Sequence, residues 1–169
     1  MNISNIGCVG PEGLMIELDD ILCLVGPNNT GKSTVLRAYE LAAGKAPFTE
    51  NDLCKRAGDS PSAIELWVHI PTGIPNIAEK WKVLEGDLRL VRSRWEWRRE
   101  TAWKPVRTTW DPEVGDWSVD TKAAGLDEVF TSRLPLPLRV GTLQDPEEEH
   151  KALLALVLQP IAERLKLYR

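Results

Sequence analysis

Short apolar runs alternate with turn-forming residues over the first part of the chain. Residues 3–9 and 14–18 are apolar-rich and flank the Gly-Pro-Glu-Gly sequence of residues 10–13, which predicts two strands joined by a turn. Residues 21–25, Ile-Leu-Cys-Leu-Val, are apolar at every position. Such a run is typical of a strand buried on both faces at the centre of an α/β sheet.

A helix is predicted soon afterwards. From Lys32 onward, apolar residues recur at helical spacing at positions 35, 36, 39, 42 and 43, and Gly44 suits a left-handed helix end. Residues 45–61 are polar and turn-rich, which predicts a loop with one helical turn. A mostly antiparallel, tryptophan-rich β-block is then expected from segments 63–70, 88–97, 106–110 and 117–120.

The end of the chain carries a helix-start signal. After a predicted short helix over 127–132 and a strand over 136–143, Asp145 can cap a helix, Pro146 fits its first position and residues 147–149 are glutamates. Pro160 should end or kink this helix, and a second helical stretch covers residues 161–168. We therefore expect a domain over residues 1–144 and a helical segment over 145–169 that leads to an insertion, an arm or a dimerisation region.

The segment between the apolar run and the helix matches the phosphate-binding motif G-x-x-x-x-G-K-[ST] in full. Glycines let backbone amides point at phosphate oxygens, and the helix N-terminus adds partial positive charge. The predicted cofactors are ATP and Mg²⁺, with Lys32 on the β- and γ-phosphates as the expected catalytic residue, Ser33 on Mg²⁺ and Thr34 on the α-phosphate. The predicted binding set is Gly26, Pro27, Asn28, Asn29, Thr30, Gly31, Lys32, Ser33 and Thr34. The alternative, a chance glycine-rich turn, is disfavoured by the complete motif and its strand–helix context.

Two other classes of P-loop protein fit the sequence less well. A GTPase would carry an Asn-Lys-x-Asp motif that reads the base, and this sequence has none. A small nucleotide kinase would need arginine-rich lid segments after the first helix, where strands are predicted instead. Strands before the P-loop and a β-block after its helix follow the order found in the first lobe of ABC-type ATPase heads.

The sequence GPNNTGKST resembles the P-loop of the SMC/RecF/OLD group of ABC-type ATPases. Its doubled asparagine is similar to OLD-family proteins, in which an N-terminal ATPase is joined to a C-terminal Toprim nuclease. The Ile-Ser-Asn-Ile start at residues 3–6 and the stretch 136–145 before a helix are similar to these heads as well. The resemblance implies an α/β P-loop NTPase fold, namely the first lobe of an ABC-type head with an antiparallel β-block and C-terminal helices, and a homodimer.

The sequence also departs from that group. Asp127-Glu128 follows Ala-Ala-Gly-Leu rather than the apolar strand of a Walker B motif, and no Leu-Ser-Gly-Gly-like signature is found. Because these motifs lie in the second lobe in the family, we expect this chain to be an N-terminal portion that binds ATP weakly and hydrolyses it poorly alone. By the same resemblance Gln144 is a candidate Q-loop residue that senses the γ-phosphate through Mg²⁺. The alternative is a solvated residue beside the Asp145 cap.

Residues 89–107 interleave cations with tryptophans. The cations are Arg89, Arg92, Arg94, Arg98, Arg99, Lys104 and Arg107, and the tryptophans of the region are Trp95, Trp97, Trp103 and Trp110. Such a stretch can bind phosphate backbones and stack on bases, so it is a candidate DNA-binding surface. The alternative is a solvated sheet face with arginines packed over tryptophans, which the alternation of the pattern favours.

Net charge and cysteine content bear on the partners and the cellular compartment of the protein. The net charge of −4 gives no global case for nucleic acid or an anionic membrane as partner. Cys8, Cys23 and Cys54 lack the spacing of zinc ligands, and Cys23 is expected to be buried and reduced. No apolar run approaches the ~18 residues of a membrane helix. We therefore expect a cytoplasmic protein without a membrane partner.

The resemblance implies a full-length enzyme that couples ATP to DNA cleavage, in defence against phage. The alternative is an SMC- or RecF-like DNA-binding ATPase that repairs or clamps DNA without cutting it. A third interpretation is a regulatory module that binds ATP and does not hydrolyse it.

Overall fold

The computed structural model describes residues 1–18, 22–70, 77–86 and 88–120, together with positions 123, 130, 131, 134, 135, 137, 151, 154 and 158. The chain divides into two compact units, Met1–Pro137 and Leu138–Arg169. In the second unit the described positions 151, 154 and 158 are helical. Every helix within the described ranges is too short or too polar to span a bilayer.

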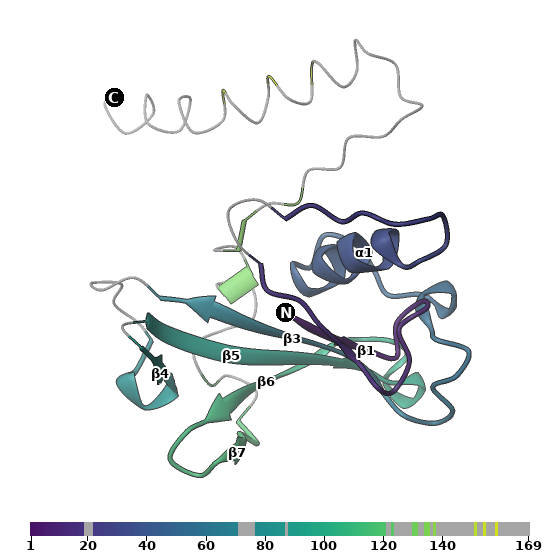
Figure 1. Ribbon diagram of the computed structural model, residues 1–169. Coiled ribbons are helices and arrows are strands. Elements are labelled where there is room, and N and C mark those ends of the chain that lie inside the picture. The colour runs from purple at the N-terminus through teal and green to yellow at the C-terminus, as the bar shows by residue number, and fades with distance from the viewer. Residues whose placement is uncertain are drawn as a thin grey trace. The chain divides into compact units, whose positions relative to one another are not determined.

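The strands of the first unit form one antiparallel sheet (Figure 1). In chain order they are β1 Asn2–Ser4, β2 Leu14–Met15, β3 Ser62–His69, β4 Val83–Glu85, β5 Leu88–Trp97, β6 Val106–Asp111 and β7 Asp116–Trp117. The order across the sheet is β2-β1-β3-β5-β6-β7, with β4 pairing with β5. β3 and β5 form the longest ladder, which runs from Ser62 opposite Trp97 to His69 opposite Leu90.

Helix α1, Lys32–Ala42, lies over one face of this sheet (Figure 1). It ends as the sequence predicts, since Gly44 has a φ of 65° and its amide donates to Leu41. Short 3-10 turns complete the described helices: η1 Glu50–Asp52, η2 Glu79–Trp81 and η3 Arg99–Thr101. The turn at η1 falls within the loop for which one helical turn is predicted.

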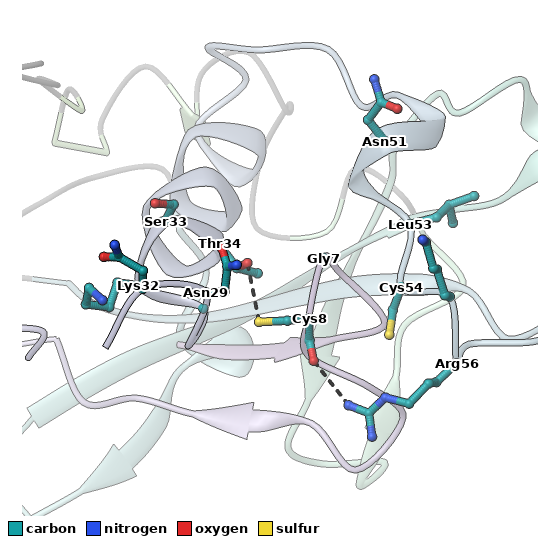
Figure 2. A pocket seen from close by; sticks show the side chains of 13 residues that line it. Gly7, Cys8, Asn29, Lys32, Ser33, Thr34, Asn51, Leu53, Cys54 and Arg56 are labelled. Carbon is teal, nitrogen blue, oxygen red and sulfur yellow. Dashed lines mark hydrogen bonds between the residues drawn. The ribbon is translucent and has the colours of Figure 1, made fainter. Parts of the chain in front are cut away.

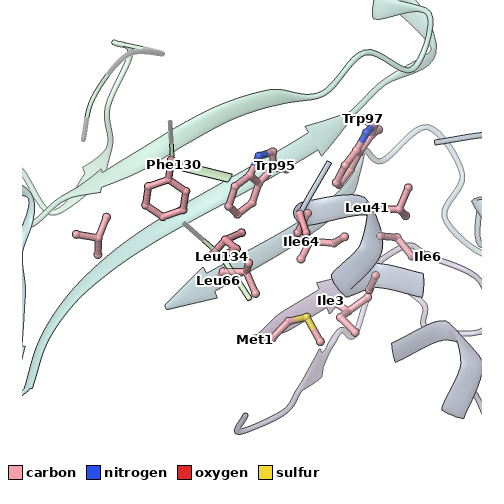
Figure 3. Close-up of a cluster of buried hydrophobic side chains, with 14 of the residues drawn as sticks. Met1, Ile3, Ile6, Leu41, Ile64, Leu66, Trp95, Trp97, Phe130 and Leu134 are labelled. Atoms are coloured by element: carbon pink, nitrogen blue, oxygen red, sulfur yellow. The ribbon is translucent and has the colours of Figure 1, made fainter. Parts of the chain in front are cut away.

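The core lies between α1 and the facing side of the sheet (Figure 3). Alternate residues of β3 and β5 point inward, because successive side chains of a strand face opposite sides. Ile64 and Leu66 from β3 meet Trp95 and Trp97 from β5, and Leu41 of α1 packs against them. Met1, Ile3 and Ile6 of the N-terminal segment complete the same cluster.

The predicted fold class, an α/β P-loop NTPase and first lobe of an ABC-type head, is wrong for this chain. The described part of the first unit is an antiparallel sheet covered by one α-helix, without a parallel strand pair. The decisive difference is at residues 22–25, which form no strand. Leu22 is 43% exposed and Val25 is 89% exposed, and Cys23 is exposed rather than buried.

The physical reason is that an apolar run becomes a central strand only if other strands pair with both of its edges. The described strands pair with one another instead, with β1 between β2 and β3 and β5 between β3 and β6. Local pattern alone does not reveal which partners exist.

The β-block is predicted more accurately than the fold class. The bounds of β5 match the prediction, β3 begins and ends one residue earlier than predicted, and β6 ends one residue later. The strands predicted over residues 3–9 and 14–18 are shorter, and β4 was missed because Val-Leu-Glu is too short to show a period. Most of the segments 127–132, 136–143 and 145–169 lies outside the described residues.

Candidate functional site: a cleft at the start of helix α1

The P-loop bends sharply and runs directly into α1. Asn29 and Gly31 have φ angles of 64° and 93°, and the first helical hydrogen bond joins the Val35 amide to the Gly31 carbonyl at 3.1 Å. Gly31 is the N-cap residue, so no side chain caps the helix, and its first turn contains no acidic residue. The first amides of a helix have no intrahelical acceptor. They are therefore available to an anion, which the helix dipole also favours.

Lys32 closes the loop in this structure. Its ammonium donates to the Gly26 carbonyl at 2.7 Å and also to the Pro27 carbonyl. Thr30 adds a hydrogen bond from its hydroxyl to the same Pro27 carbonyl at 2.9 Å. To reach a phosphate, Lys32 must exchange neutral carbonyl acceptors for charged oxygens, which form stronger hydrogen bonds with a cation.

A cleft of about 940 Å³ opens beside this loop (Figure 2). We call it the P-loop cleft. The start of α1 forms one wall, the segment 51–56 forms the opposite wall, and the turn at Gly7 and Cys8 lies between them. Its lining residues are Gly7, Cys8, Asn28, Asn29, Gly31, Lys32, Ser33, Thr34, Asn51, Leu53, Cys54, Lys55 and Arg56.

The turn at Gly7 and Cys8 packs tightly on the P-loop. The Cys8 thiol and the Thr34 hydroxyl are 3.6 Å apart. A β-carbon at Gly31 would lie 2.5 Å from the Cys8 sulfur, and one at Gly7 would lie 2.7 Å from the Thr34 hydroxyl oxygen. Both glycines also have φ angles in the left-handed region. Both the close contacts and the backbone conformation therefore require glycine at these positions.

Arg56 is held in place on the opposite wall. Its Nη2 donates to the Cys8 carbonyl at 3.1 Å and to Glu12 Oε1 at 2.9 Å. A hydrogen bond from its own backbone amide lowers the pKa of the Glu12 carboxyl, and the Arg56 hydrogen bond lowers that pKa further. The same hydrogen bond with Glu12 raises the pKa of the Arg56 guanidinium. Gly10 makes room for this pair, because a β-carbon there would clash with both side chains.

A partly buried ion pair ties the opposite wall to α1. Arg37 Nε donates to Asp52 Oδ1 at 2.8 Å and Arg37 Nη2 to Asp52 Oδ2 at 3.0 Å, while the Thr49 amide donates to Oδ2 at 2.8 Å. Burial raises the pKa of the Asp52 carboxyl, but the hydrogen bonds from Arg37 and Thr49 outweigh burial and leave that pKa lowered. We call this group the Arg37–Asp52 clamp.

The charged side chains that line the P-loop cleft in the described part of the chain are cations, one of which, Arg56, pairs with Glu12. The described lining residues of the cleft include Lys32, Lys55 and Arg56 and no carboxylate. Mg²⁺ bound to a nucleotide needs few protein ligands, since phosphate oxygens and waters fill most of its coordination sites. Ser33 lies in the first turn of α1 and lines the cleft, so its hydroxyl fits the role of the protein ligand. The described residues hold no group of three His, Cys, Asp or Glu side chains that could bind a metal by themselves.

The structure brings most of the predicted phosphate-binding residues to this cleft. Asn28, Asn29, Gly31, Lys32, Ser33 and Thr34 line it. Gly26, Pro27 and Thr30 instead take part in the hydrogen bonds that close the loop. Gln144 lies outside the described residues. Sequence reasoning missed the Gly7–Cys8 turn and the Lys55–Arg56 wall, because nothing in their local pattern shows that they meet the P-loop.

The basic and aromatic stretch divides between the two sides of the sheet. On the side away from α1, the Arg92 guanidinium lies over Trp67 and Trp110, at 4.7 and 4.5 Å from the ring centroids. Arg92 also donates to Glu65 at 2.7 Å. On the inner side, Arg107 is 1% exposed and donates to the Ala123 carbonyl. The cation–π pairs given as the alternative are therefore present, and DNA binding at this stretch stays a prediction.

Comparisons of this chain with protein-family models, with curated proteins and with solved structures found no match. The resemblance to OLD-family ATPases therefore stays a prediction that depends on the P-loop residues quoted above.

Proposed function

We propose that this chain binds the phosphate chain of a nucleoside triphosphate, with Mg²⁺, in the P-loop cleft. The observation that carries the proposal is the complete phosphate-binding motif of residues 26–34. The motif leads into the uncapped N-terminus of α1, which lines a cleft with cations on both walls. Of the predicted context of the motif, the helix that follows it is present, whereas residues 22–25 before it form no strand, so the proposal rests on the motif, the start of α1 and the cleft.

The roles of the residues follow from their positions. The amides at the start of α1 donate hydrogen bonds to the phosphate oxygens, and Lys32 turns from the Gly26 and Pro27 carbonyls to those oxygens. Ser33 would hold Mg²⁺, which neutralises part of the phosphate charge when bound. We expect this chain alone to hydrolyse ATP poorly, because the described lining residues include no carboxylate to orient an attacking water.

Titration calorimetry of the chain with ATP and Mg²⁺ tests the proposal. We expect measurable binding, and we expect Lys32→Ala to weaken it at least about tenfold, because removing a charge-assisted contact costs about 1.5–3 kcal/mol. Lys45→Ala is the matched control, since Lys45 is an exposed lysine just beyond the other end of α1 and does not line the cleft. Equal affinities for the two variants, or no binding by the unmodified chain, would overturn the proposal.

A further inference from the structure

The wall of the P-loop cleft opposite the P-loop carries two adjacent cations that the sequence motif does not include. Lys55 and Arg56 line the same cleft as Lys32, from a segment that follows η1 rather than from the P-loop. We infer that Lys55 and Arg56 are phosphate-binding residues and that the cleft recognises its ligand through the phosphate chain rather than through the base. This inference rests on the proposed function, since it concerns the same ligand.

Arg56 is pre-positioned for this role. Its Nη2 donates to the Cys8 carbonyl and to Glu12, and these two exposed hydrogen bonds direct the guanidinium to the edge of the cleft in the absence of a ligand. A guanidinium carries five N–H donors, so two acceptors on one nitrogen do not exhaust its capacity. A planar, fixed fork of donors suits phosphate oxygens in particular.

The wall that carries these cations is rigidly attached to the P-loop helix. The Arg37–Asp52 clamp joins α1 to η1 only three residues before Lys55. The Gly7 amide donates to the Asp52 carbonyl at 2.7 Å, and the Cys54 amide donates to the Asn5 carbonyl at 3.3 Å. The distance between the two cationic walls is therefore set by hydrogen bonds on both sides of residues 52–54.

Both walls of the cleft offer donors that suit a polyphosphate, although Leu53, Cys8 and Cys54 also line it. Three cations, the backbone at Gly31, and the hydroxyls of Ser33 and Thr34 are all donors to phosphate oxygens. The side chain of Asn51 points away from the P-loop in Figure 2. A polyphosphate that contacts both walls obtains its affinity from charge, and charge does not distinguish one base from another.

The test compares inorganic tripolyphosphate with ATP and GTP, each with the same Mg²⁺ concentration, by titration calorimetry on the whole chain. We expect the three dissociation constants to agree within about threefold. No binding by any of them would contradict the proposed function itself. Binding of ATP at least about tenfold tighter than tripolyphosphate would overturn this inference while leaving the proposed function intact.

Variants separate a ligand contact from a structural role. We expect Arg56→Ala and Lys55→Ala to weaken tripolyphosphate and ATP equally, each by about fivefold or more, whereas the exposed Lys104→Ala outside the cleft should change neither. Glu12→Gln keeps a side-chain oxygen that can accept from Arg56 but removes the negative charge that competes with phosphate, so it should leave the affinity unchanged or increase it. If Arg56 only held the turn through Glu12, Glu12→Gln would weaken binding as Arg56→Ala does, and that result would overturn the inference.

Discussion

At the scale of single residues, two glycines decide whether the P-loop cleft forms. Gly31 caps α1 with a φ of 93°, and its missing side chain leaves room for the Cys8 sulfur. Gly7 gives the same room to the Thr34 hydroxyl from the other side. The phosphate-binding motif requires glycine at position 31 because the loop curls there. The structure adds a second reason, which is the contact of Gly31 with the turn at Gly7 and Cys8.

Gly31→Ala should therefore destabilise the chain through two separate effects. The left-handed backbone costs a non-glycine residue about 1–3 kcal/mol, and the clash with Cys8 adds to that cost. Gly44→Ala is the control, because Gly44 has a φ of 65° and open space around it, so only the backbone effect applies. Urea unfolding measures both. We expect Cys8→Ala to recover part of the loss in the Gly31→Ala background, and strictly additive effects would contradict the contact.

At the scale of elements, the Arg37–Asp52 clamp holds the opposite wall of the cleft against α1. Asp52 accepts hydrogen bonds from Arg37 and from Thr49, so losing its charge should loosen both connections. Because these partners lower the pKa of Asp52 in the folded chain, the stability they provide is complete above the ordinary value of 3.8. That stability is lost as the pH falls through the lowered pKa.

Asp52→Asn tests this element by its pH dependence. We expect a loss of about 1–3 kcal/mol in the free energy of unfolding at pH 7, because charge-assisted hydrogen bonds are replaced by weaker ones. The variant should then lose less stability than the unmodified chain as the pH falls from the ordinary carboxyl value of 3.8 through the lowered pKa of Asp52. Asp59→Asn, at an exposed position, serves as control. Identical acid profiles for Asp52→Asn and the unmodified chain would contradict the clamp.

On the side of the sheet away from α1, packed arginines should stabilise the fold. Glu65 accepts from Arg92 and from the Trp67 indole, and Arg94 lies 4.3 Å over the Trp117 ring. Arg92→Ala removes both the ion pair and the ring contacts, so it should destabilise the chain by about 1–3 kcal/mol.

Arg89→Ala is the matched control on the same strand. Arg89 pairs with Glu79, whose side chain is largely exposed, and exposed pairs contribute about 0–1 kcal/mol. Guanidinium unfolding followed by tryptophan fluorescence measures both variants. A cost for Arg92→Ala no larger than that for Arg89→Ala would show that the packed arginine does not stabilise the sheet.

At the scale of the whole molecule, the sequence predicts local features better than their arrangement. The β5 bounds, the start of α1 at Lys32 and the left-handed Gly44 follow from local spacing and turn chemistry, which short-range forces determine. The fold class depends on which strands pair, and the apolar run before the P-loop gives no information about its partners. The exposed Val25 shows the consequence, since its apolar pattern alone predicts burial.

Only part of the candidate site could be predicted from the sequence. The P-loop wall could be predicted, because phosphate binding imposes a contiguous motif on residues 26–34. The Gly7–Cys8 turn and the Lys55–Arg56 wall could not, because they reach the cleft only through β1 and the Arg37–Asp52 clamp. Long-range hydrogen bonds, such as the one from the Asn5 side chain to the Pro61 carbonyl, fix these segments without leaving a local sequence signal.

The most direct test of phosphate binding in the P-loop cleft is a titration of the isotope-labelled chain with ATP and Mg²⁺, followed by amide chemical shifts. Binding in the P-loop cleft predicts that the largest shifts occur at residues 29–34 and 54–56, on the two walls of the cleft, and that Lys32→Ala requires at least about tenfold more ligand to produce them. Residues of β7 and of the hairpin before it should be unaffected. If saturating ATP left the amide signals of Gly31, Lys32 and Ser33 unshifted, that result would contradict phosphate binding in the P-loop cleft.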